Sequence, residues 1–144
     1  TVLTRLVAER PVWGFSNDDM HNPALHAGHN WNVMLVPELT SGALRRAMEG
    51  GVSFYVFAPE GHNGPPPPEI RAVSVDRCEG VISLDVTGHK RVEWISEGRK
   101  VHEGASINLD ELDMLGSYVR ATVYSASGGP LIGTQPFILR ARLA

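Results

Sequence analysis

Four consecutive prolines, Pro65 to Pro68, interrupt the chain near its middle. Because proline fixes φ and has no amide hydrogen, such a run excludes a helix or a central strand and favours a stiff, extended segment. We therefore predict a Pro-rich linker over residues 59–68. It divides the chain into an N-terminal segment, 1–58, and a C-terminal segment, 69–144.

Composition excludes several classes of function. The 144 residues are 42% hydrophobic and 20% charged, which suits a globular chain with a real core. The formal net charge is -3 and the basic residues are scattered, so nucleic acid is not an expected partner. The single cysteine, Cys78, excludes an internal disulfide and a Cys-based zinc site. No apolar run approaches the length needed to span a bilayer, so we expect no membrane association.

The N-terminal segment shows a strand and helix pattern. Helical spacing predicts a helix over residues 1–9, ended by Pro11, and apolar runs predict strands at 12–15 and 31–36. A helix is expected at 41–49, with Thr40 as its N-cap and Gly50-Gly51 as its stop, followed by a strand at 52–57. Strand, helix and strand in this order predict a β-α-β unit of the kind that ends a β/α barrel.

The C-terminal segment has a period of two. Alternating apolar residues predict strands at 70–75, 81–86, 92–96, 117–125 and 134–140, and glycine-containing turns separate them. Pro136 is compatible only with an edge or a bulge. Short strands with regular turns predict an antiparallel β-sandwich, so the fold class of the whole chain is α+β.

The candidate site is the polar loop between Trp13 and Trp31. Asp19 and His21 are one residue apart, so on an extended backbone both side chains point to the same side. A carboxylate beside an imidazole suits a divalent cation such as zinc, manganese or iron. The alternative is that Asp18 or Asp19 caps the following turn and that His21 is an ordinary surface residue.

Other polar residues of the loop have predicted supporting roles. Asp18 is expected to orient a metal ligand rather than to bind metal itself. His26 and His29 are three residues apart and predict loop packing or contact with a substrate phosphate. A facial site made from Asp19, His21 and one of these histidines is an alternative. His62, in the linker, is expected to be solvated.

Three stretches resemble one family. The stretches are, in this order, PVWGFSNDDMH, the Gly28 to Asn32 segment and LTSGALRRAMEGGVSFYV. Together they resemble the end of the catalytic domain in the polymerase and histidinol phosphatase (PHP) family of metal-dependent phosphoesterases. The resemblance implies that residues 1–58 are the C-terminal remnant of a PHP-type β/α barrel. In residues 69–144, Tyr118 resembles the corner tyrosine of immunoglobulin-like sandwiches, and the order of WIS, YVRA and TQPF resembles the accessory sandwich of some bacterial PHP-like domains, so an appended immunoglobulin-like β-sandwich is expected there. Asp19 and His21 match the D-x-H motif that the family uses as metal ligands.

The resemblance also implies a function for a longer parent protein. The family's earlier motifs, beginning with H-x-H, do not precede Trp13, so the upstream part of the same polypeptide is the expected partner. The parent is expected to bind divalent metal ions and to hydrolyse phosphate esters of small molecules through a metal-bound water. The fragment alone, with no catalytic residue of its own, is expected to be inactive. The alternative is a non-enzymatic β-sandwich interaction or structural module attached to a degenerate PHP-like domain.

Overall fold

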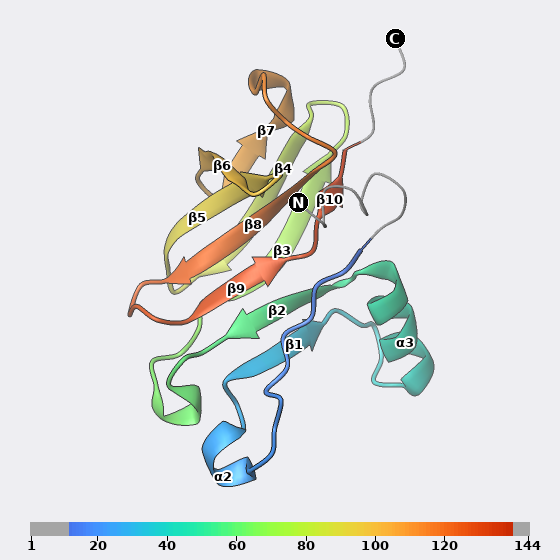
Figure 1. The fold of residues 1–144 in the computed structure, drawn as a ribbon. Helices are drawn as coiled ribbons and strands as arrows, with labels where there is room; N and C mark the ends of the chain where they lie inside the picture. The colour runs from blue at the N-terminus through green and yellow to red at the C-terminus, as the bar shows by residue number, and fades with distance from the viewer. Residues whose placement is uncertain (1–11, 140–144) are drawn as a thin grey trace.

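The computed structural model describes residues 12–139, so the helix predicted at 1–9 lies outside the described residues. This range folds mainly into two antiparallel sheets that face each other (Figure 1). The larger sheet has the order β1-β2-β9-β8-β5-β6, with β10 paired to β8, and the smaller has the order β3-β4-β7. The predictions of an α+β class and of a sandwich of antiparallel strands are confirmed. No helix between residues 12 and 139 has the length and apolar content to cross a membrane.

The elements follow one another with short connections. The strands are β1 (Asn30–Met34), β2 (Ser53–Phe57), β3 (Glu69–Asp76), β4 (Val81–Thr87), β5 (His89–Ser96), β6 (Arg99–Glu103), β7 (Ser106–Asn108), β8 (Tyr118–Ser125), β9 (Leu131–Thr134) and β10 (Phe137–Ile138). The helices are α2 (Pro23–His26) and α3 (Ser41–Gly50), with 3-10 turns η1 (Gly61–Asn63) and η2 (Leu109–Glu111).

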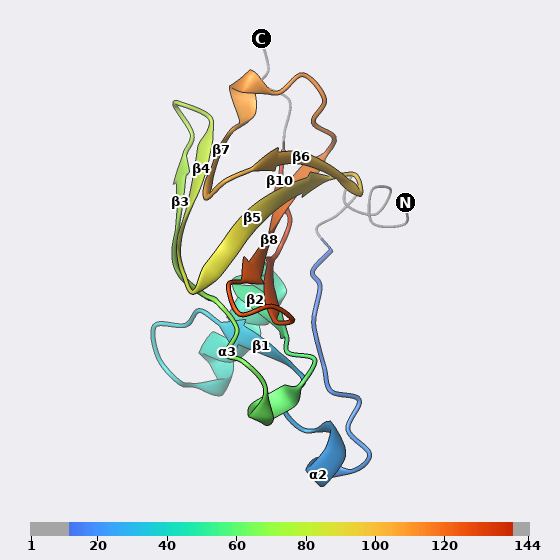
Figure 2. The same ribbon diagram turned by 90° about the vertical axis from the view of Figure 1, so that its left-hand side faces the viewer.

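The main core lies between the two sheets, which Figure 2 shows edge on. Trp94 of β5 is fully buried there, and its indole Nε1 donates a hydrogen bond to the carbonyl oxygen of Gly104 at 2.8 Å. Alternate residues of β8, including Val119 and Ala121, face Ile82 of β4. The period of two in the sequence therefore does identify the buried faces of these strands.

The helix α3 forms as the sequence predicts. Thr40 Oγ1 accepts a hydrogen bond from the Ala43 N–H at 3.2 Å, and Gly51 ends the helix in the left-handed conformation with φ 66°. The parallel β-α-β crossover is nevertheless wrong, because β1 and β2 are adjacent antiparallel strands. The helix is inserted at the end of a hairpin, beyond the pairing of Met34 with Ser53, instead of running back along the sheet (Figure 1).

The proline segment joins two sheets of one sandwich. It runs from η1 to β3 without regular structure, as predicted, but Pro68 is fully buried and the carbonyl oxygen of Pro66 accepts a hydrogen bond from Ser125 Oγ at 3.3 Å. On its N-terminal side, β2 pairs with β9 from the C-terminal segment. The segment predicted as a boundary at 59–68 therefore does not divide the chain into separate sheets, because strands from both sides of it share the larger sheet.

Several strand predictions need correction. Residues 12–15 are extended but belong to neither sheet, and the strand expected at 134–140 is replaced by β9 and β10, with Pro136 in the break between them. The short strands β6 and β7 were not predicted. β7 has only three residues, and β6 contains a single apolar residue, Val101, so neither shows an alternating pattern.

Candidate functional site

The segment that leads into the polar loop is held by side chains of the sheet. Trp13 Nε1 donates to the carbonyl oxygen of Glu49 at 2.9 Å, near the end of α3. The Gly14 N–H donates to Gln135 Oε1 at 2.8 Å, and Gln135 Nε2 donates back to the Gly14 carbonyl oxygen at 2.7 Å. The side-chain amide thus takes the place that a neighbouring strand would occupy.

The same arrangement recurs two residues later. The Ser16 N–H donates to Asn32 Oδ1 at 3.0 Å, and Asn32 Nδ2 donates to the Ser16 carbonyl oxygen at 2.8 Å. The side-chain amides of Asn32, in β1, and Gln135, after β9, therefore form the backbone hydrogen bonds that a neighbouring strand would otherwise provide to this extended segment. Sequence reasoning missed both, because a single Asn or Gln near a strand carries no local signal for such a contact.

Asp18 anchors the loop. Its carboxylate accepts three backbone hydrogen bonds, from the N–H groups of Gly28 at 2.7 Å, His29 at 2.8 Å and Asn30 at 2.6 Å. The hydrogen bond from Gly28 is the largest cause that lowers the pKa of the Asp18 carboxyl from its ordinary value, and the bonds from Asn30 and His29 add to it against partial desolvation. Asp18 therefore joins the start of the loop to its end.

Asp19 has an unusual backbone conformation. Its φ is 48°, in the left-handed region, so the chain is not extended there and the spacing argument for side chains on one side does not apply. Its side chain is exposed and makes no hydrogen bond or ion pair with residues 12–139. A non-glycine residue held at positive φ is found preferentially at functional positions.

His21 is fixed by its neighbour in the D-x-H motif. Its Nδ1 lies 2.7 Å from the backbone carbonyl oxygen of Asp19. Because a carbonyl oxygen can only accept, Nδ1 carries the hydrogen and the neutral ring has its lone pair on Nε2. Metal-binding histidines commonly donate their second nitrogen to a carbonyl in this way.

His26 shows the opposite arrangement. It ends α2, which Asn22 caps, and its Nδ1 accepts the backbone N–H groups of His21 and Asn22, each at 3.2 Å. In the neutral ring the hydrogen is therefore on Nε2, which leaves no lone pair for a metal. The ring closes the turn beside His21, in line with the loop-packing role rather than the ligand role.

Two histidines interlock the loop with the linker. His29 Nδ1 lies 3.1 Å from the carbonyl oxygen of Pro59, and its ring covers Gly61. In return, the ring of His62 covers Gly28 so closely that a side chain at residue 28 would overlap it. His62 is exposed, as predicted for a solvated residue, but it also packs on the loop that Asp18 anchors.

The loop does not assemble a complete metal site by itself. No group of three His, Cys, Asp or Glu residues between 12 and 139 is placed to hold one ion. The facial alternative, with Asp19, His21 and His26 or His29, is not assembled in this conformation. What the loop presents is an exposed carboxylate and an imidazole with a ligand-competent Nε2.

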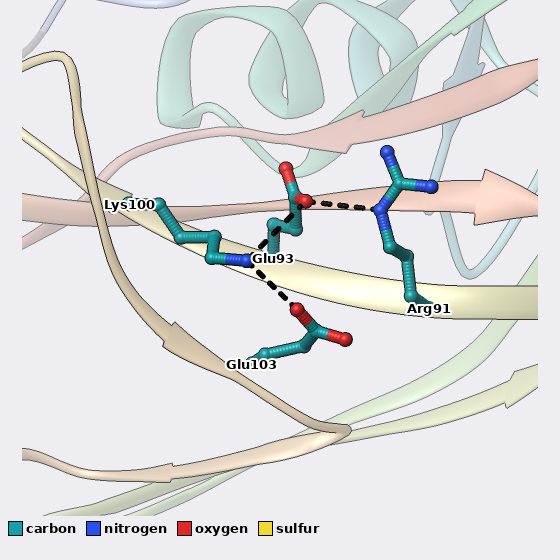
Figure 3. Close-up of polar contacts among 4 residues, drawn as sticks. All are labelled: Arg91, Glu93, Lys100 and Glu103. Carbon is teal, nitrogen blue, oxygen red and sulfur yellow. Dashed lines mark hydrogen bonds and ion pairs between the residues drawn. The ribbon is translucent and has the colours of Figure 1, made fainter.

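A second polar cluster lies on β5 and β6 and is balanced in charge (Figure 3). Glu93 contacts Arg91 at 2.9 Å and Lys100 at 3.7 Å, and Lys100 also contacts Glu103 at 2.8 Å. The Arg91 guanidinium lies 3.8 Å from the ring centroid of Tyr124. The hydrogen bond from Arg91 is the main cause that lowers the pKa of Glu93. With two cations matched to two anions, the cluster offers no excess charge to a ligand.

No family model, no curated protein and no solved structure matches the chain.

Proposed function

We propose that Asp19 and His21 supply part of the divalent metal centre of a phosphoesterase, and that an upstream part of the same polypeptide supplies the remaining ligands. The observation that carries the proposal is the tautomer of His21. Its Nδ1 donates to the Asp19 carbonyl oxygen, which leaves the Nε2 lone pair for a metal, and Asp19, two residues earlier in the chain, carries an exposed carboxylate.

The donor set fits the proposed metals. One carboxylate and one neutral imidazole suit zinc, manganese or iron, and two ligands fall short of the three or more that a catalytic centre takes from protein. A bound divalent ion would supply polarisation of phosphoryl oxygens and activation of water. The shortfall is the reason for placing the other ligands outside residues 12–139.

The other loop residues then have positioning roles. Asp18 holds the two ends of the loop together through three backbone N–H groups, and His26 closes the turn that presents His21. His29 packs on Gly61, so contact with a substrate phosphate requires the linker loop to move. We assign His29 to loop packing.

The PHP resemblance supports the proposal, and the fold indicates what the proposed upstream part would add. Residues 12–58 contribute a helix-containing hairpin and a loop, and they pair through β2 with the sandwich. In this proposal the upstream part brings the barrel to this hairpin. The immunoglobulin-like sandwich is then an accessory domain, and its Gln135 holds Gly14, in the segment that leads into the D-x-H loop.

The test begins with the 144-residue chain. Zinc is titrated while the histidine ring nitrogens are followed by long-range proton–nitrogen NMR. The Nε2 signal of His21 should shift first and saturably, whereas His102, on β6, serves as an internal reference. Asp19→Ala and His21→Ala should weaken binding at least about tenfold, since each removes a ligand. His102→Ala is the matched control.

The second arm uses the intact polypeptide that contains this chain. Bound metal and hydrolysis of a panel of phosphomonoesters and phosphodiesters should fall together in Asp19→Ala. Unchanged metal content and unchanged hydrolysis in that variant would remove the assignment. A folded intact protein with neither metal nor hydrolysis would favour the alternative, a non-enzymatic interaction or structural module on a degenerate PHP-like domain.

A further inference from the structure

A small cavity lies beside the segment that leads into the polar loop. It has a volume of about 250 Å³ and is lined by Trp13, Phe15, Tyr55, Arg120, Gln135 and other residues. It lies on the outer face of the large sheet, because Arg120 alternates along β8 with Val119 and Ala121, which face the core. Nothing in the metal proposal uses this cavity.

Arg120 is the only cation among the described residues that line the cavity. Its side chain is half-buried, and Nη1 donates to Tyr55 Oη at 3.3 Å and to Thr122 Oγ1 at 3.1 Å. Among residues 12–139 no carboxylate forms an ion pair with it, and Nη1 alone donates hydrogen bonds to protein. A partly desolvated guanidinium without a counter-ion favours the binding of an anion, for which its planar donors are suited.

Tyr55 adds a second donor. Its ring lies over Gly133 of β9, where a side chain would overlap it, so the glycine allows the hydroxyl to reach Arg120. Because Tyr55 Oη accepts from Arg120, its own O–H hydrogen is available to donate to a ligand oxygen. Cation and hydroxyl therefore offer complementary donors at one cavity.

We propose that Arg120 and Tyr55 form a binding site for a small oxyanion, either a carboxylate or a phosphate, whose body packs against Trp13 and Phe15. The cavity is below the roughly 300–1,000 Å³ typical of sites for drug-sized ligands, so the ligand is one anionic group on a compact body. The balanced cluster around Glu93 lacks such a free cation.

The experiment titrates the 144-residue chain separately with inorganic phosphate and with acetate, at an ionic strength held constant with sodium chloride. Backbone amide signals of Gly14 and Gln135 and the indole signal of Trp13 report on the cavity. Saturable shifts confined to these signals are expected for at least one of the anions. The anion that binds with the higher apparent affinity identifies the ligand class as phosphate or carboxylate.

Variants distinguish this site from general anion binding. Arg120→Gln should weaken the apparent affinity at least about tenfold, as for loss of a charged hydrogen-bonded partner. Tyr55→Phe, which keeps the ring, should weaken it by about threefold or more. Arg99→Gln, an exposed arginine on β6, is the matched control and should change nothing. If Arg120→Gln does not fold, Arg120→Lys replaces it, since lysine keeps the charge but loses the planar fork.

Three results would overturn the proposal. One is the absence of saturable shifts with both anions. Another is equal affinity in the wild-type protein, Tyr55→Phe and the Arg120 variant. The third is a response spread evenly over surface lysines and arginines, which would indicate nonspecific screening.

Discussion

The indole of Trp13 lies against Gly51, the residue that ends α3. Gly51 has φ 66°, and a Cβ atom there would come within 2.5 Å of the indole ring. Trp13 also donates to the Glu49 carbonyl oxygen. Gly51 therefore allows both a left-handed helix end and the close packing of the Trp13 ring, which holds the segment that leads to the polar loop.

Gly51→Ala should destabilise the chain more than a left-handed glycine elsewhere. Left-handed backbone costs a non-glycine residue about 1–2 kcal/mol, and displacing a packed ring costs a further 1–3 kcal/mol or so. The free energy of unfolding, from urea titration, should fall by about 2–5 kcal/mol. Gly128→Ala is the control, because Gly128 has φ 83° with nothing within 4 Å of its Cβ position. Equal losses in the two variants would show that the Trp13 contact contributes nothing.

Asp18→Asn should loosen the end of the loop. The amide cannot reproduce a carboxylate that accepts three N–H groups, so the amides of Gly28, His29 and Asn30 should exchange with solvent faster. Exchange is measured by NMR, with Asp113→Asn, at an exposed position, as control. Unchanged exchange at all three amides would contradict the anchoring role.

The same bonds predict a pH dependence. The pKa of Asp18 is lowered in the folded state, so its stabilisation is fully present above the ordinary value of 3.8 and is lost as the pH falls through the lowered value. In the wild-type protein the three amides should become less protected over that acidic range. In Asp18→Asn this change should be absent.

Two substitutions of Asp19 separate backbone strain from metal binding. Glycine adopts φ near 48° freely and alanine does not, so Asp19→Gly should be more stable than Asp19→Ala by about 1–2 kcal/mol. Both variants lack the carboxylate and should lose the same amount of zinc affinity. Equal stability of the two by thermal and urea unfolding would place residue 19 outside the left-handed region. Different zinc affinities would mean that backbone geometry, rather than the carboxylate, controls binding.

Glu93→Gln should change how stability depends on pH. The pKa of Glu93 is lowered, first by the hydrogen bond from Arg91, so its stabilisation is present above the ordinary value of 4.5 and is lost as the pH falls through the lowered value. The variant should be less stable than the wild-type protein at neutral pH and equal to it in strong acid. Glu103→Gln, which touches only Lys100 in this cluster, should show a smaller neutral-pH loss. A constant difference between Glu93→Gln and wild type at all pH values would contradict the assignment.

Local signals predicted the local structure well. The caps of α3, the break at the prolines and the alternating faces of β4, β5 and β8 all follow from residues within a few positions of each other. The direction of β2 relative to β1 does not, since the same strand-helix-strand pattern fits a parallel crossover or a helix inserted in a hairpin. The structure has the second arrangement, with β1 and β2 antiparallel, and β2 also pairs with β9, more than 70 residues further along the chain.

At the candidate site, residue identity indicated Asp19 and His21, and the metal assignment stays a prediction. The extended backbone assumed for them was wrong, because the loop between Asp18 and Asn30 is closed by backbone N–H groups that no spacing rule anticipates. The loop-packing role of His26 likewise depends on the backbone N–H of His21, which its Nδ1 accepts, and that of His62 depends on its contact with Gly28.

Side-chain chemistry and short-range sterics are enough to predict where the chain must turn, which strand faces are apolar and which residues are able to bind a cation. Other contacts depend on the packing of the whole fold: the side-chain amides of Asn32 and Gln135 pair with backbone groups of Ser16 and Gly14, and Arg120 meets Tyr55 over Gly133. These contacts join residues 16 to 121 positions apart, so their energies exist only once the sheets have brought the partners together.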